Sequence, residues 1–229
     1  MKLIFISDTH TKHSKLFIPP CDILFCCGDI SFTGERFEVV NFASWFNEQP
    51  ARYKIFIPGN HEVALEKYLP ESKLWLTESC PDIKILLHES ITIEGIKIFG
   101  SPYTPIFQDW AFMRSNSDRE RLWKQIPEDT EILITHGPAF GVLDNFLTNY
   151  TDDNKFVPTY RKYIGCKYLS SKINLLPNLK IHAFGHCHAG YGRSQGNYIN
   201  NKLISINAAS CSENYEIENA PQLIEFPPN

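Results

Sequence analysis

The sequence lacks the features that mark membrane, nucleic-acid-binding and disordered proteins. None of its apolar runs approaches the roughly 20 residues that a membrane-spanning helix needs. It contains no low-complexity tract, internal repeat or linker, so we expect a single domain over residues 1–229. The formal net charge of −4 provides no basic surface. We therefore expect neither a membrane nor nucleic acid as a partner.

Cysteine pairs of the CxxC kind are also absent. The chain has 7 cysteines, an odd number, with no spacing that suggests a disulfide framework or a thiolate zinc site. So many unpaired thiols are uncommon in secreted proteins, which favours a reducing compartment. The first apolar run leads directly into Asp8, a candidate site residue, so we expect no cleaved signal peptide. These observations predict a soluble, cytoplasmic protein.

Short apolar runs and helical patterns alternate in the first part of the chain. Runs at 3–7, 22–27 and 53–58 predict buried strands, and the apolar spacing over 35–49 predicts a helix between the last two. This order is typical of a parallel βαβ unit. Three further short strands predict an antiparallel meander that opens a second sheet; they are 83–87, 91–93 and 96–99.

The second half of the chain repeats these signals less regularly. A helix is predicted from about Ser117 to Gln125, with Ser117 as its N-cap and Glu120 at the capping-box position. Residues 139–163 show weak periodicity and predict a loop with short helical turns. The other expected elements are strands at 131–135 and 179–184, a helix at 166–176 and hairpins from 191 to 206. We predict an α/β fold of two mixed β-sheets flanked by helices.

The predicted strands end in residues that can bind metals. The segments are Asp8-Thr9-His10, Gly28-Asp29, Gly59-Asn60-His61-Glu62, His136-Gly137-Pro138 and Gly185-His186-Cys187-His188. Side chains two residues apart in an extended segment point the same way, so Asp8 and His10 can reach one metal together. His186 and His188 can share one centre in the same manner. Asp29 can bridge two cations through its two oxygens.

Carboxylate, imidazole and amide groups without a thiolate make up this donor set. The candidate metal ligands are Asp8, His10, Asp29, Asn60, His136, His186 and His188. Such a set suits Mn²⁺, Fe or Zn²⁺ better than Ca²⁺ or Mg²⁺. Two divalent ions would hold a hydroxide between them for in-line attack on a phosphoryl group. The pattern therefore predicts a hydrolytic centre with two metal ions, Mn²⁺ being our first choice.

Neighbouring residues suggest further roles. His61 lies beside Asn60 but should face outward, where its imidazole could protonate the leaving alkoxide. Glu62 would then orient a ligand or its loop. Arg114 and Asn116 lie in a polar loop of the second sheet and are candidate phosphate contacts.

Aromatic residues and one further histidine have structural as well as functional interpretations. Trp110 and Phe112 could stack on a nucleobase, but we expect them to pack between the sheets. His182 lies inside a predicted strand, where we expect a hydrogen-bonded core residue.

The five segments, in this order, resemble the calcineurin-like metallophosphoesterase superfamily. The resemblance implies a sandwich of two mixed sheets flanked by helices. It implies that Asp8, His10 and His188 hold one metal and that Asn60, His136 and His186 hold the other. Asp29 would bridge the two metals, and His61 would be the catalytic acid.

A narrower resemblance concerns the segments 28–34, 100–105, 135–138 and 188–192, which are similar to the metallophosphoesterase-domain-containing phosphodiesterases. It favours a phosphodiesterase that acts on a small-molecule phosphoester or nucleotide. Two alternatives remain open. One is a protein or nucleotide phosphomonoesterase, and the other is a non-catalytic scaffold of the same fold.

Overall fold

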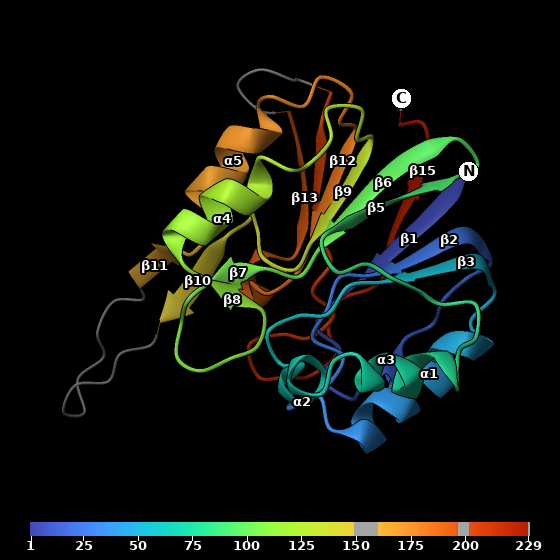
Figure 1. Cartoon of the computed structure of the whole chain (residues 1–229). Coiled ribbons are helices and arrows are strands. Elements are labelled where there is room, and N and C mark those ends of the chain that lie inside the picture. The colour runs from blue at the N-terminus through green and yellow to red at the C-terminus, as the bar shows by residue number, and fades with distance from the viewer. Residues whose placement is uncertain (149–159, 197–201, 229) are drawn as a thin grey trace.

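Two mixed β-sheets lie face to face between two layers of helices (Figure 1). This arrangement is that of a computed structural model, which describes residues 1–148, 160–196 and 202–228. The predicted fold class is confirmed.

The first sheet has the strand order β15-β1-β2-β3-β4. The strands are β1 (Lys2–Ile6), β2 (Cys21–Cys26), β3 (Ala51–Phe56), β4 (Lys84–Ile85) and β15 (Gln222–Glu225). The strands β1 to β4 run parallel and β15 is antiparallel to β1. Leu3 and Phe5 pack into the core between the sheets, whereas Ile4 and Ile6 pack under the helices. A strand that is buried on both faces in this way appears in the sequence as a continuous apolar run.

The second sheet has the order β13-β14-β12-β9-β6-β5. Its strands are β5 (Glu89–Ile93), β6 (Ile96–Ser101), β9 (Ile132–Thr135), β12 (Ile181–Phe184), β13 (Gly192–Gln195) and β14 (Ile204–Asn207). The four central strands are parallel, and the edge strands β5 and β13 are antiparallel to their neighbours. Two small two-stranded sheets lie outside it: β7 (Thr104–Pro105) with β8 (Met113–Arg114), and β10 (Asn145–Thr148) with β11 (Tyr160–Tyr163).

Helices cover the outer face of each sheet (Figure 1). The first sheet is covered by α1 (Arg36–Glu48), α2 (Val63–Lys67) and α3 (Glu71–Thr77), and the second by α4 (Asn116–Trp123) and α5 (Lys167–Ile173). Two 3₁₀ turns complete the elements, η1 (His13–Lys15) and η2 (His188–Gly190). In the described part of the chain, none of the helices has the length and apolar character required to cross a membrane.

Several expectations differ from the structure. β4 joins the first sheet beside β3 and is not part of a meander with β5 and β6. The N-cap of α4 is Ser115, whose hydroxyl accepts the N–H of Asp118 at 3.1 Å, so Ser117 is not the cap. Within 139–163, where we expected loop and helical turns, β10 and β11 form an antiparallel pair, and residues 149–159 lie outside the described part of the chain.

His182 is buried in the second sheet, as expected, but it is hydrogen-bonded through one nitrogen only. The hydroxyl of Thr135 donates to the Gly137 carbonyl, so its oxygen accepts the Nε2–H of His182 at 2.9 Å. Nδ1 is buried without a partner among the described atoms. Burial lowers the pKa of this imidazole to about 3.

This pKa shift predicts a pH dependence of folding. The unfolded chain gains a proton at His182 below its usual pKa of about 6.5, and the folded chain does not until about 3. The stability contribution of the neutral ring is therefore present above pH 6.5 and is lost as the pH falls towards 3.

We expect His182→Phe to lose less stability than the parent protein on acidification. The difference in slope should approach about 1.4 kcal/mol per pH unit for this one proton. Urea unfolding of chelator-treated protein at pH 7 and pH 5 measures this difference. Equal changes in the free energy of unfolding with pH for the two proteins would contradict the prediction.

Candidate metal centre

The carboxyl ends of five parallel strands meet at one edge of the two sheets. Asp8, Asp29 and Asn60 follow β1, β2 and β3, which are neighbours in the first sheet. His136 and His186 follow β9 and β12, which are neighbours in the second. The sheets are joined here by the Ser7–Ala209 bridge and by the hydrogen bond from Ser210 N–H to the Ser7 carbonyl at 2.8 Å.

The turns after these strands use backbone conformations that few residues adopt readily. Asp8, Asp29 and His186 have φ of 51°, 54° and 67°, in the left-handed region. Gly185 precedes His186 where a side chain cannot fit, because an added Cβ would lie 2.0 Å from the Asp8 carboxylate. The side chains of Asp8 and His186 are thereby aimed at the same space, and the Asp8 carboxylate accepts the His186 N–H at 2.9 Å.

The seven predicted metal ligands come together in two groups. One holds Asp8, His10 and His188, and the other holds Asp29, His136 and His186, with the ligand atoms of each group within 4.8 Å of one another. The side-chain oxygen of Asn60 lies 3.0 Å from His136 Nε2 in the second group. A third combination joins Asp29 to His10 and His61, so the Asp29 carboxylate lies between the two groups.

Backbone carbonyls fix the tautomers of three of these imidazoles. His10, His136 and His188 each place Nδ1 next to a carbonyl, those of Ser31, Cys27 and Ser212, at 3.1, 2.8 and 2.9 Å. A carbonyl only accepts, so each Nδ1 carries a proton, and in its neutral form each ring directs a lone pair on Nε2 into the site.

The nitrogen lone pairs make the site a good fit for cations. Nε2 of His10 and Nε2 of His188 face each other at 3.3 Å, and two lone pairs at this distance need a proton or a metal ion between them. Burial lowers the pKa of His10 and of His186 to about 4, so both rings are neutral at pH 7. Burial opposes the charged form of Asp29, yet the neighbouring His136 holds its pKa well below the usual range. Burial opposes the charged form of His136 as well, but the Asp29 carboxylate beside it raises its pKa to about 9, so this ring holds a proton that a bound cation would displace. Imidazoles beside ionised carboxylates are the donor set of a divalent-metal site.

Glu62 organises the loop that carries Asp29. Its carboxylate accepts the N–H groups of Gly59, Asp29 and Ile30 at 2.6, 2.9 and 3.1 Å, and the Ser31 hydroxyl at 2.7 Å. Burial, and then the nearby Asp29 carboxylate, raise the pKa of Glu62 to about 7. The predicted orienting role for Glu62 agrees with this placement.

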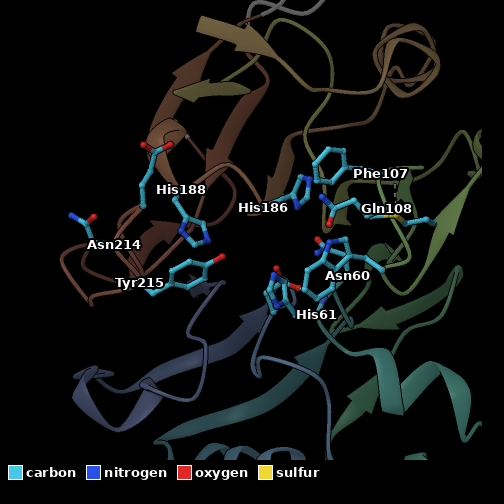
Figure 2. A pocket seen from close by; sticks show the side chains of 12 residues that line it. Asn60, His61, Phe107, Gln108, His186, His188, Asn214 and Tyr215 are labelled. Atoms are coloured by element: carbon cyan, nitrogen blue, oxygen red, sulfur yellow. Dashed lines mark hydrogen bonds between the residues drawn. The ribbon is translucent and has the colours of Figure 1, made fainter. Parts of the chain in front are cut away.

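A cavity of about 480 Å³ opens over the two groups. Figure 2 shows His186 and His188 on opposite sides of the opening, with the Tyr215 hydroxyl directed into it. The described lining residues are Asp29, Asn60, His61, Phe107, Gln108, Trp110, Met113, His186, His188, Glu213, Asn214 and Tyr215.

Arg114 and Asn116 are not brought into this cavity. Nη1 and Nη2 of Arg114 donate to the Glu66 carboxylate at 3.3 and 3.2 Å, and the guanidinium lies 4.5 Å from the centre of the Tyr103 ring. The side-chain oxygen of Asn116 accepts from Arg119. The geometry does not favour a phosphate contact for either residue, since each already has a partner elsewhere.

Other lining residues were missed or misjudged. Tyr215 belongs to a C-terminal loop with no sequence motif, and its ring packs edge-on against His10 at 4.8 Å. Phe112 is buried beneath the helices of the first sheet and Trp110 lines the cavity, so the expectation that both pack between the sheets was wrong. Only the contacts of the folded chain reveal these positions.

The comparisons with known proteins agree with this geometry. The sequence profile of the family described as calcineurin-like phosphoesterase matches residues 1–190. The human metallophosphoesterase domain-containing protein 1 is 31% identical over 99% of this chain and 71% of its own length. A UPF0046 protein of Caenorhabditis elegans is 29% identical over 99% of this chain and 76% of its own length.

A solved structure shares the fold at low sequence identity. Phosphopantetheinyl hydrolase from Mycobacterium tuberculosis is similar with a TM-score of 0.58 at 15% identity, and the match covers 99% of this chain and 96% of that one.

The contacts of Glu62 predict its effect on metal binding. In Glu62→Gln the side-chain amide retains one acceptor for several donors, so the Asp29 turn should loosen. We expect the Kd for Mn²⁺ to rise by about 10- to 100-fold in calorimetric titration, as is typical when a group that orients ligands is lost.

Glu38→Gln is the matched control for this experiment. Its carboxylate also accepts backbone N–H groups, those of Phe32, Thr33 and Glu35, but none from a predicted ligand. Its Mn²⁺ affinity should be close to that of the parent protein. A folded Glu62→Gln protein with the parent affinity would contradict the prediction.

Proposed function

The chain belongs to the calcineurin-like phosphoesterase family, and from this premise we propose that it is a phosphodiesterase for small phosphodiesters or nucleotides. The observation that carries the choice of a diester is the charge of the cavity. Among its described lining residues there is no lysine or arginine, and Glu213 adds a carboxylate. A phosphomonoester carries a second negative charge, and sites that bind it commonly supply arginine or lysine. A diester carries a single charge and needs no such partner.

The ligand groups described above would hold two divalent cations. When bound, these supply an activated water and neutralise the charge that builds on the phosphoryl oxygens during in-line displacement. Asp8, His10 and His188 would hold one of them, and Asn60, His136 and His186 the other, with Asp29 shared. Mn²⁺ is our first choice because the donor set mixes nitrogen and oxygen without thiolate; Fe and Zn²⁺ are the alternatives.

We assign to His61 the role of donating the proton that the leaving group needs. Its Nδ1 lies 2.9 Å from the Phe32 carbonyl and must carry a hydrogen, so Nε2 is the nitrogen that exchanges a proton. A ring nitrogen lies within 4.8 Å of ligand atoms of Asp29 and His10. As the phosphorus–oxygen bond breaks, the departing oxygen keeps the electron pair and takes the proton from Nε2, leaving a neutral imidazole.

We also propose a cytoplasmic location. All 7 cysteines are free thiols, and 6 of them are buried. Free thiols at this density are typical of proteins kept in a reducing compartment.

The proposed reaction can be tested by measuring hydrolysis of a diester and of a monoester. Metal-stripped protein with Mn²⁺ added back should cleave bis-p-nitrophenyl phosphate with a higher kcat/KM than p-nitrophenyl phosphate. Faster cleavage of the monoester would favour the phosphomonoesterase alternative. Absence of turnover on both substrates, with no metal retained by elemental analysis, would favour the scaffold.

The charge argument predicts a change in specificity. Gln108 lines the cavity, and Gln108→Lys would add the missing cation at its wall. We expect kcat/KM for the monoester to rise relative to the diester by several-fold, up to about tenfold, because a charge-assisted contact contributes roughly 1.5 kcal/mol. Gln108→Met, which has a similar length and no charge, is the control and should leave the ratio unchanged. An equal ratio in both variants would contradict the role given to charge.

A further inference from the structure

Trp110 lies on a loop that is hydrogen-bonded to the segment that carries Asn60 and His61. The loop connects β7 to β8, and the Ala111 N–H next to Trp110 donates to the Asn60 carbonyl at 2.9 Å. Asn60 immediately precedes His61. The backbone at Trp110 and the backbone at His61 are therefore linked through adjacent residues.

A second contact holds the same end of this loop, next to β8. The Phe112 N–H donates to the Glu66 carboxylate at 2.7 Å, and Ala111 and Phe112 are each only 3% exposed. Glu66 also binds Arg114 of β8, so the end of the loop that follows Trp110 is fixed. Trp110 itself is half-buried and lines the cavity.

The indole of Trp110 covers one face of the His61 imidazole. The ring centres are 4.4 Å apart and the planes are inclined by 32°. His10 meets the same imidazole edge-on at 4.7 Å, and the Phe32 carbonyl binds its Nδ1. The imidazole is thus held at one nitrogen and by two rings, and Nε2 is the nitrogen left for chemistry.

We infer that Trp110 is a positioning residue for the proton donor His61. This inference rests on the proposed phosphodiesterase function and on the proton-donating role proposed for His61. The terminal torsion of a histidine side chain has a broad energy profile, so a single hydrogen bond leaves the ring free to rock. The indole limits this motion, because aromatic rings in contact attract each other beyond the effect of the area that they bury. A small displacement of a reacting group can cost about 100-fold in rate.

A role as a stacking surface for the substrate is less consistent with the contacts. One face of the indole is already occupied by His61, and the Trp110 backbone is fixed by its neighbours. Phe107 is 63% exposed on the same cavity wall and has more free ring surface. Trp110 therefore acts on the reaction through His61.

The test compares two diesters that differ in leaving-group basicity. Bis-p-nitrophenyl phosphate releases a weakly basic phenolate that needs little protonation, and diphenyl phosphate releases a more basic one of nearly the same shape. We expect Trp110→Ala to lower kcat by about 10- to 100-fold on diphenyl phosphate and only a few-fold on the nitro ester. Trp110→Phe keeps an aromatic face and should recover most of the loss.

Further variants separate the possible outcomes. Adding Trp110→Ala to His61→Ala should cause no additional loss on diphenyl phosphate, since both changes affect one function. Trp75→Ala removes a half-buried tryptophan of α3, and its ratio of rates on the two esters should match the parent protein. A rise in KM on both esters at constant kcat would overturn the inference and make Trp110 a binding surface.

A spectroscopic measurement tests the contact without relying on activity. In protein loaded with diamagnetic Zn²⁺, the indole should shift the His61 ring proton resonances upfield, and Trp110→Ala should abolish this shift. An unchanged His61 resonance would overturn the inference. A third outcome is that His61→Ala loses the same factor in kcat on both diesters although the upfield shift is present in the parent protein. The role of His61 as proton donor would then be wrong, and with it the inference for Trp110, while the contact between the two rings would be confirmed.

Discussion

The Glu62 carboxylate is the contact on which the metal centre depends most. It accepts backbone N–H groups from both the loop after β2 and the loop after β3, and so holds together two of the strand ends that supply ligands. Asp29 in turn accepts the His61 N–H at 2.9 Å, which connects the shared carboxylate to the proposed proton donor. The hydrogen bonds that it accepts from these N–H groups also offset the free-energy cost of burying the Glu62 carboxylate.

The positive φ values at Asp8, Asp29 and His186 follow from this arrangement. The left-handed conformation is unfavourable for residues with a Cβ, and it persists only where surrounding contacts determine it. Here the contacts are hydrogen bonds: the Glu62 carboxylate accepts the Asp29 N–H, and the Asp8 carboxylate accepts the His186 N–H. The strain is located at the ligands, where it directs side chains from two sheets into one space.

The sequence predicted the features that depend on short segments. Asp8 and Asp29 lie at one edge of the first sheet, and His136 and His186 at one edge of the second, because parallel strands align their carboxyl ends, so convergence within each sheet followed from order alone. The features that were missed depend on tertiary contacts. Arg114 looked available in sequence, but Glu66, which is distant along the chain, occupies its guanidinium. Tyr215 reaches the cavity from the far C-terminal region, which no local pattern indicates.

The floor and the wall of the cavity contribute different interactions: the floor provides groups that bind cations, and the wall provides uncharged contact area. The floor gathers carboxylates and imidazoles, so cations bound there would provide the positive charge that lysine or arginine side chains do not provide among the described lining residues. The wall is formed largely by Phe107, Trp110 and Tyr215, whose rings contribute contact area without charge. A phosphoryl group would then be attracted by the metal centre alone, and its substituents would meet rings. This division is the physical basis on which we propose a diester, with its single negative charge, as the substrate rather than a monoester.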